Sequence, residues 1–123
     1  MNAIDTSSLR RFLAGEKGRD ADLVALSIAE ARAVVPPAVI CEALSDPALP
    51  ADLADAIAGL PALEILEGYW VRAGLLRARL IRRGRKAKLA DVLIAQACID
   101  HEVPLITNDR DFRHFVAHGL KVV

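Results

Sequence analysis

Residues 89–112, LADVLIAQACIDHEVPLITNDRDF, decide the fold that this sequence predicts. The stretch begins with an apolar segment of helical character that carries one carboxylate near its start, Asp91. Residues 103–107 then predict a short strand, which ends in the acidic turn NDRD. Helix, tight turn, strand and acidic turn make up half of an α/β unit. Ligands bind beyond the carboxyl ends of strands in such sheets, so Asp109 and Asp111 stand where a site is expected.

The rest of the chain repeats this alternation of short apolar strands and helical segments. Strands are expected at residues 3–4, 33–35, 62–66, 103–107 and 120–123. A long amphipathic helix is expected between Gly68 and Gly84, and Asp20 is expected to cap a helix nearer the start. Parallel neighbours need crossover helices, so we predict a three-layer α/β/α sandwich with a five-stranded, mainly parallel sheet. Residues 1–123 suffice for one such domain and are too few for two.

The composition indicates a protein partner, and it gives no indication of a nucleic-acid ligand. The 16 basic and 16 acidic residues balance, so overall charge gives no sign of nucleic-acid binding. The hydrophobic fraction of 54 % and the mean hydropathy of +0.30 are high for a small soluble domain, which predicts apolar surface buried against another protein. Basic residues are concentrated in one short stretch, which comprises Arg77, Arg79, Arg82, Arg83, Arg85, Lys86 and Lys88.

Cysteine usage and hydropathy predict a soluble cytoplasmic protein. Cys41 and Cys98 lie in apolar sequence without metal-binding spacing, so both are expected to be buried in a reducing compartment. No apolar run reaches the roughly 20 residues that a membrane helix needs. The chain opens directly on a predicted strand, without a segment of signal-peptide character.

Four carboxylates recur at the ends of the predicted strands and the starts of the predicted helices. Asp5, Asp91 and Asp109 can each be explained as a helix cap, and Glu42 can be explained as a solvent-facing side chain. Their joint pattern favours a site, because the strand-to-helix junctions of a parallel sheet share one edge. Close carboxylates repel one another unless a cation neutralises them. With no Cys or His pair nearby, such oxygens suit Mg²⁺ or Mn²⁺ better than zinc.

A magnesium site made of carboxylates is typical of phosphoryl chemistry. The ion lowers the pKa of a bound water, orients it towards a phosphodiester and stabilises the leaving oxygen. Ser7, Ser8 and Thr107 lie close to these acids in the sequence, so their hydroxyls are expected to bind ligands or waters.

The chain resembles a PIN-domain ribonuclease and, within that family, a VapC-type toxin of a type II toxin-antitoxin pair. The resemblance covers essentially the whole chain, although residues 46–66 look abbreviated. It rests on four motifs: IDTS at residues 4–7, the segment from Pro37 to Ala43, LADVLIA at 89–95 and LITNDRDF at 105–112.

The resemblance implies a site, an activity and two partners. It assigns the catalytic metal site to Asp5, Glu42, Asp91 and Asp109, with Asp111 as a further candidate ligand. It also implies strand order 3-2-1-4-5, which sets the first and fourth strands side by side. The implied activity is Mg²⁺- or Mn²⁺-dependent endonucleolytic cleavage of RNA, with 5′-phosphate and 3′-hydroxyl ends. The implied partners are a second copy, giving a homodimer, and a small antitoxin whose tail blocks the acidic groove.

The basic stretch and the hydroxyls complete the predicted substrate site. We expect Arg83, Arg85 and Lys86 to attract RNA phosphates, with Ser7 and Thr107 as further substrate contacts. A solvated helix end explains the same cations equally well. Aromatic residues make up only 4 % of the chain, which argues against a base-stacking platform and favours recognition of RNA shape. The alternative to an enzyme is a PIN-like RNA- or protein-binding module without turnover.

Overall fold

Three short parallel strands form the centre of the computed structural model, which describes residues 1–123. Strand β1 (Asn2–Ile4) lies between β2 (Ala33–Val34) and β3 (Leu105–Ile106), in the order β2-β1-β3. Ala3 pairs with Val34 on one side and with Leu105 on the other. The first strand and the strand of the C-terminal third are therefore neighbours, and their carboxyl ends open at the same edge.

The sheet has three strands, so the prediction of five was wrong in number. The two outer strands are reduced to single parallel bridges, Val35 with Ala62 and Leu105 with Val122. Counted with these bridges, the extended segments follow the predicted order 3-2-1-4-5. Pro61 has no amide hydrogen and contributes only its carbonyl, 2.8 Å from the Val35 nitrogen, so the outer ladder is not continued on that side.

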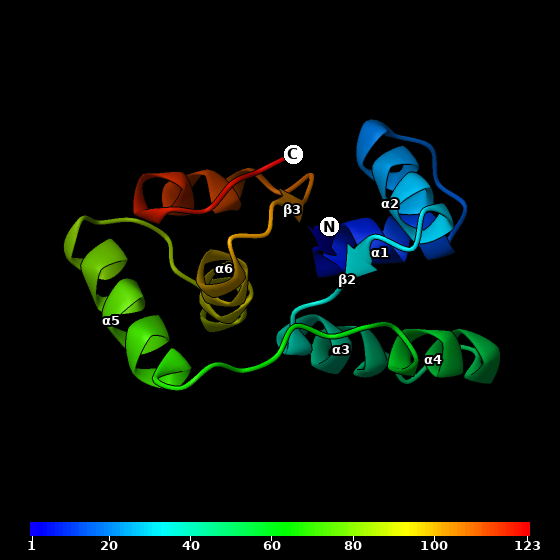
Figure 1. The fold of residues 1–123 in the computed structure, drawn as a ribbon, viewed down its shortest axis with the longest axis horizontal. Helices are drawn as coiled ribbons and strands as arrows, with labels where there is room; N and C mark the ends of the chain where they lie inside the picture. Colours follow the sequence, from blue (N-terminus) through cyan, green and yellow to red (C-terminus); the bar gives the residue numbers. More distant parts are fainter.

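Six α-helices and one 3₁₀-helix surround the sheet. They are α1 (Thr6–Leu13), α2 (Arg19–Ala29), α3 (Pro37–Leu44), α4 (Ala51–Ala58), α5 (Tyr69–Arg82), α6 (Leu89–His101) and η1 (Arg110–His118). Figure 1 shows α5, α6 and η1 on one side of the sheet and α1 and α2 on the other. The fold class is thus the predicted α/β type. No helix is both long and apolar enough to cross a bilayer.

Helix α6 is the buried support of the site. Its Val92, Ile94, Ala95 and Cys98 are almost completely buried, and it packs against α5, α3 and η1. Helix α5 is the long amphipathic helix predicted between Gly68 and Gly84, and its inward face consists of Tyr69, Ala73, Leu76 and Leu80. Arg72 of α5 fastens the two helices with a two-pronged ion pair to Asp100, at 2.6 and 3.0 Å.

Two local predictions were wrong. Cys41 is exposed, because α3 turns Val39 towards the core and leaves Cys41 on another face. Asp20 does not cap α2, since Gly18 is the N-cap residue. Asp20 instead lies buried and accepts hydrogen bonds from the Ser8 hydroxyl (2.8 Å) and Arg11 Nε (3.1 Å). Ser8 is therefore bound to Asp20 and is not directed at the four predicted acids.

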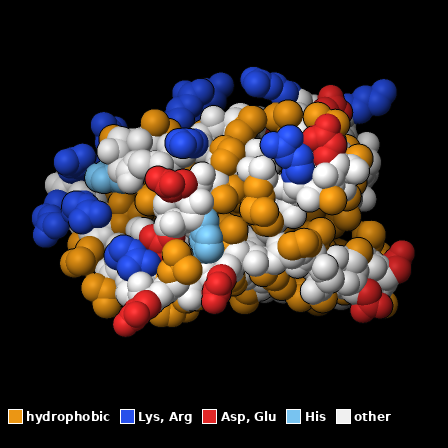
Figure 2. All heavy atoms as spheres, in the orientation of Figure 1, with side chains coloured by type: hydrophobic (Ala, Val, Ile, Leu, Met, Phe, Trp, Pro, Cys, Tyr) orange, Lys and Arg blue, Asp and Glu red, His pale blue; other side chains and the backbone are white.

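Basic side chains are unevenly distributed over the surface. In the orientation of Figure 1, Lys and Arg side chains gather at the left edge of the molecule, where the C-terminal end of α5 lies (Figure 2). Arg82, Arg83, Arg85 and Lys86 are all exposed there or in the turn that follows α5. The charge concentration seen in the sequence is therefore also a concentration in space.

Candidate metal site and nuclease centre

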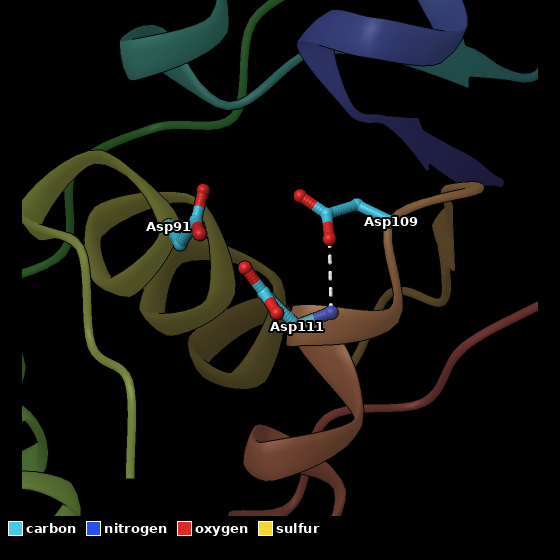
Figure 3. A group of neighbouring side chains, drawn as sticks. All are labelled: Asp91, Asp109 and Asp111. Carbon is cyan, nitrogen blue, oxygen red and sulfur yellow. Dashed lines mark hydrogen bonds between the residues drawn. The ribbon is translucent and has the colours of Figure 1, made fainter.

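Three aspartates lie together where β3 ends and α6 begins. Asp91 is in the first turn of α6, Asp109 is the N-cap residue of η1, and Asp111 is in the first turn of η1. One carboxylate oxygen from each residue lies within 4.8 Å of the others, and we call this group the three-aspartate cluster. Figure 3 shows the three carboxylates facing one another across the space between α6 and the start of η1.

The turn after β3 sets the positions of Asp109 and Asp111. The Asp109 amide donates to the Thr107 hydroxyl oxygen (3.0 Å), and the Asp111 amide donates to Asp109 Oδ1 (2.9 Å). Asp109 therefore caps η1 with one oxygen, and its second oxygen makes no hydrogen bond within the chain. Capping and ligand binding are compatible for this residue. Asp91, in contrast, makes no capping hydrogen bond, so a cap does not explain it.

Asp5 lies at the end of β1 and is held by three donors. Its Oδ1 accepts from the Thr6 amide (2.7 Å), and its Oδ2 accepts from the hydroxyls of Ser7 (2.9 Å) and Thr107 (2.8 Å). Burial raises the pKa of Asp5 above its ordinary value, the three hydrogen bonds partly oppose that rise, and the charge of Asp109 adds to it. Thr107 thus connects the ends of β1 and β3 through a single hydroxyl.

Glu42 approaches the site from α3. Its Oε1 accepts a hydrogen bond from the Thr6 hydroxyl (2.7 Å), and its carbonyl accepts one from Arg10 Nη2 (2.8 Å). Glu42 and Asp5 are not part of the three-aspartate cluster, whereas Asp111 is. The fold therefore brings the four predicted acids to one region, but only Asp91 and Asp109 of the four belong to the three-aspartate cluster.

The electrostatics of Asp91 link all of these acids. Its pKa is raised to about 6, first by burial and then by the negative charges of Asp109, Asp5 and Glu42, with Lys88 opposing the rise. The negative charges of the other three predicted acids therefore all raise the pKa of the Asp91 carboxyl. A cation placed among them would relieve this repulsion, which is the physical reason that such clusters bind metals.

The donor set fits a hard divalent cation. The three-aspartate cluster offers only carboxylate oxygens, with no His or Cys, which suits Mg²⁺ or Mn²⁺ and does not suit zinc. Lys86 Nζ lies 3.2 Å from Asp111 Oδ2 and neutralises part of the charge at the outer side of the cluster. Lys86 thus lies beside the acids, while Arg83 and Arg85 lie further along, at the far part of η1.

Sequence reasoning missed two contributions to this site. It did not assign Thr6, whose amide binds Asp5 and whose hydroxyl binds Glu42. Its position directly after Asp5, at the start of a helix, is the signal that could have identified it. It also described Thr107 only as a substrate contact, whereas this hydroxyl binds Asp5 and Asp109 at the same time.

The chain belongs to the PIN domain family, because the sequence model of that family matches residues 3–117. Among solved structures, the chain is similar to one described as the crystal structure of FitAcB from Neisseria gonorrhoeae. The TM-score is 0.71 at 16 % sequence identity, and the match covers 99 % of this chain and 96 % of that chain, so the two share a fold. A search of curated proteins found no match. PIN domains are generally nucleases that act with divalent metal ions.

Proposed function

We propose that this protein is a divalent-metal-dependent endoribonuclease and the toxin of a toxin-antitoxin pair. The observation that carries the proposal is the three-aspartate cluster beside Asp5, at the carboxyl edge of a PIN-domain sheet. This is the position at which parallel α/β sheets bind ligands. The resemblance to VapC-type toxins supplies RNA as the substrate class, and cysteine usage and hydropathy support the cytoplasm as the location.

The chain's own residues divide the work at this site. Asp91, Asp109 and Asp111 would hold Mg²⁺ or Mn²⁺ through their free carboxylate oxygens. Such an ion would lower the pKa of a bound water and stabilise negative charge on the phosphate. Asp5 is buried and fixed by its hydrogen bonds, so it presents an oriented acceptor for a hydrogen of a water bound beside it.

Other residues position the catalytic acids and the substrate. Thr6 fixes Glu42 by a 2.7 Å hydrogen bond, so Glu42 faces the site with little conformational freedom. Ser7 and Thr107 each donate a hydroxyl hydrogen to Asp5 and so hold its carboxylate in place. Lys86 adds a positive charge at the entry, where it attracts RNA phosphates and balances Asp111.

Apolar surface supports the proposed partners. Helix α5 exposes Trp70, Val71 and Leu75 to 64 %, 67 % and 55 %, which is unusual for large apolar side chains on one helix. Beside it, an apolar groove of about 550 Å³ lies between α3, α5 and α6 and reaches Glu42. We propose that the α5 surface forms a homodimer and that an antitoxin segment enters the groove towards the acids.

The decisive experiment measures RNA cleavage by the purified protein. A mixed-sequence RNA should be cut with Mn²⁺ or Mg²⁺ and remain intact in EDTA, and the products should carry 5′-phosphates. Asp91→Asn should reduce the rate by at least about a hundredfold, whereas Asp55→Asn, on the exposed face of α4, should leave it unchanged.

The same experiment separates the enzyme from a binding module. Retained RNA binding without metal-dependent cleavage, in a folded wild-type protein, would identify the chain as a PIN-like module without turnover. Isothermal titration with Mn²⁺ adds an independent measurement. If the wild-type protein binds no Mn²⁺, the proposed catalytic centre is wrong.

A further inference from the structure

A second polar hollow lies away from the acids, between the C-terminal end of α5 and η1. Its volume is about 240 Å³, and its apolar lining consists of Leu80 and Ala117. All of its polar lining comes from basic side chains, namely Arg83, Arg85, Arg113, His114 and His118. We call it the cationic pocket. It lies at the edge of the molecule where Figure 2 shows Lys and Arg gathered.

The side chains of the cationic pocket have no partners within the chain. None of the five takes part in an ion pair or a side-chain hydrogen bond, whereas two nearby basic residues, Arg77 and Lys86, do. Arg77 donates to the carbonyl of Ala87, and Lys86 pairs with Asp111. A solvated helix end would explain cations on α5 alone. It does not explain why η1 brings Arg113, His114 and His118 to the same hollow.

The electrostatic environment of the pocket favours an anion. The pKa of His118 lies below its ordinary value, because of its burial and the positive charges of Arg83 and Arg79. Converging positive charges without an acid are unfavourable in the free protein and become favourable when an anion binds. Arginine forks bind phosphate oxygens in pairs, which makes phosphate the anion that this lining suits best.

The cationic pocket is separated from the acids by a distance along η1. A 3₁₀-helix rises about 2 Å for each residue, so His114 lies about 6 Å and His118 about 14 Å beyond Asp111 along η1. Arg113 also lines the hollow formed with Thr107 and Asp109. A strand whose scissile phosphate sits at the three-aspartate cluster can therefore continue along η1 and reach the pocket with another phosphate.

We infer that the cationic pocket binds a backbone phosphate of the RNA substrate next to the cleavage site, through Arg83, Arg85 and Arg113. The identity of the ligand as RNA rests on the proposed function, while the preference for phosphate rests on the pocket itself. The pocket thus fixes the direction in which the strand crosses the acids and contributes to affinity for the substrate.

The test measures binding without cleavage. A fluorescein-labelled, mixed-sequence oligoribonucleotide is titrated in EDTA with the full-length wild-type protein and with Arg83→Gln/Arg113→Gln. The matched control is Arg19→Gln/Arg32→Gln, which removes the same charge from exposed residues in and just after α2. Inorganic phosphate serves as competitor, and circular dichroism verifies that each variant is folded.

The expected result is about a tenfold loss of RNA affinity in the pocket variant and little change in the control. The slope of log K against log salt should become shallower by about 0.7, the value for one phosphate contact on a single strand. Millimolar phosphate should displace RNA from the wild-type protein and shift the imidazole NMR signals of His118.

Two results would overturn the inference. One is equal RNA affinity and equal salt dependence in the pocket and control variants. The other is a response of His118 to phosphate without any RNA binding by the wild-type protein, which would make the pocket a site for small anions only. If RNA binds through the pocket but no metal supports cleavage, the proposed nuclease fails and the pocket stands.

Discussion

Removal of the Asp91 charge should stabilise the metal-free protein. The folded chain raises the pKa of Asp91 from 3.8 to about 6, chiefly through burial and the charges of neighbouring acids. The unfolded chain has no such environment, so ionisation of Asp91 weakens the fold. The protonated Asp91 carboxyl therefore contributes stability that is fully present below pH 3.8 and is lost as the pH rises through about 6.

The magnitude follows from the size of the pKa change. A rise from 3.8 to about 6 corresponds to about 3 kcal/mol at pH 8, and solvent around the half-buried side chain reduces this to about 1–3 kcal/mol. For a domain of 123 residues, 1 kcal/mol shifts the melting temperature by about 4 °C. Asp91→Asn should therefore melt about 4–12 °C above the wild type at pH 8 in EDTA, with a much smaller difference at pH 4.

Thermal unfolding followed by circular dichroism measures this effect. Asp55→Asn is the matched control, because it removes one carboxylate from an exposed position of α4. Millimolar Mn²⁺ should raise the melting temperature of the wild type and leave that of Asp91→Asn unchanged. The reasoning is refuted if Asp91→Asn in EDTA is less stable than the wild type at pH 8, or if its advantage is the same at pH 4.

Three further predictions concern residues that support the site or its partners. Burial alone would raise the pKa of Asp100, but the hydrogen bonds and charge of Arg72 hold it below 3.8. Asp100→Asn should therefore lower the free energy of unfolding in urea by about 2 kcal/mol at pH 7, and the difference should vanish as the pH falls through the folded-state pKa of Asp100. Thr107→Val should raise the pKa of Asp5 further and move the acidic limb of the pH–rate profile in Mn²⁺ to higher pH. Thr107→Ser keeps the hydroxyl and should restore the wild-type profile. An unchanged profile in Thr107→Val would contradict the role given to this hydroxyl. Trp70→Ser should weaken self-association at least about tenfold in sedimentation equilibrium without lowering the melting temperature of the monomer, whereas an unchanged dimer would exclude this surface as the interface.

Local rules predicted the central part of the fold because local and tertiary preferences agree there. The apolar run of α6 is long and buried, and β3 follows it after a short turn. Asp109 is both a good N-cap and a good ligand, so either interpretation places it at the same point in space.

The outer strands could not be predicted in the same way. A strand exists only where a neighbour supplies hydrogen bonds, and residues near Ala62 and Val122 meet the sheet at a single bridge each. Their apolar composition predicts burial correctly for Leu63 and Leu120, which pack in the core without extending the sheet. The apolar pattern alone does not distinguish a strand that pairs with the sheet from a buried segment that does not extend it.

The membership of the three-aspartate cluster depended on details beyond spacing. Asp111 joins because η1 starts as a tight 3₁₀ turn capped by Asp109, which holds its carboxylate near that of Asp91. Asp5 and Glu42 are held in the same region by the hydroxyls of Thr107 and Thr6, whose partners the spacing of the acids alone does not predict. Sequence reasoning therefore predicted that acids meet at this edge of the sheet, and the structure shows which carboxylates lie closest.

The hydrogen bond between Thr107 and Asp5 joins two residues that are 102 positions apart. A chain still under synthesis can form many of its helices but lacks this bond and the pairing that supports it until β3 has been made. Until then, the acids from the two ends of the chain remain apart. The proposed site is therefore completed only when the C-terminal part of the chain has paired with β1.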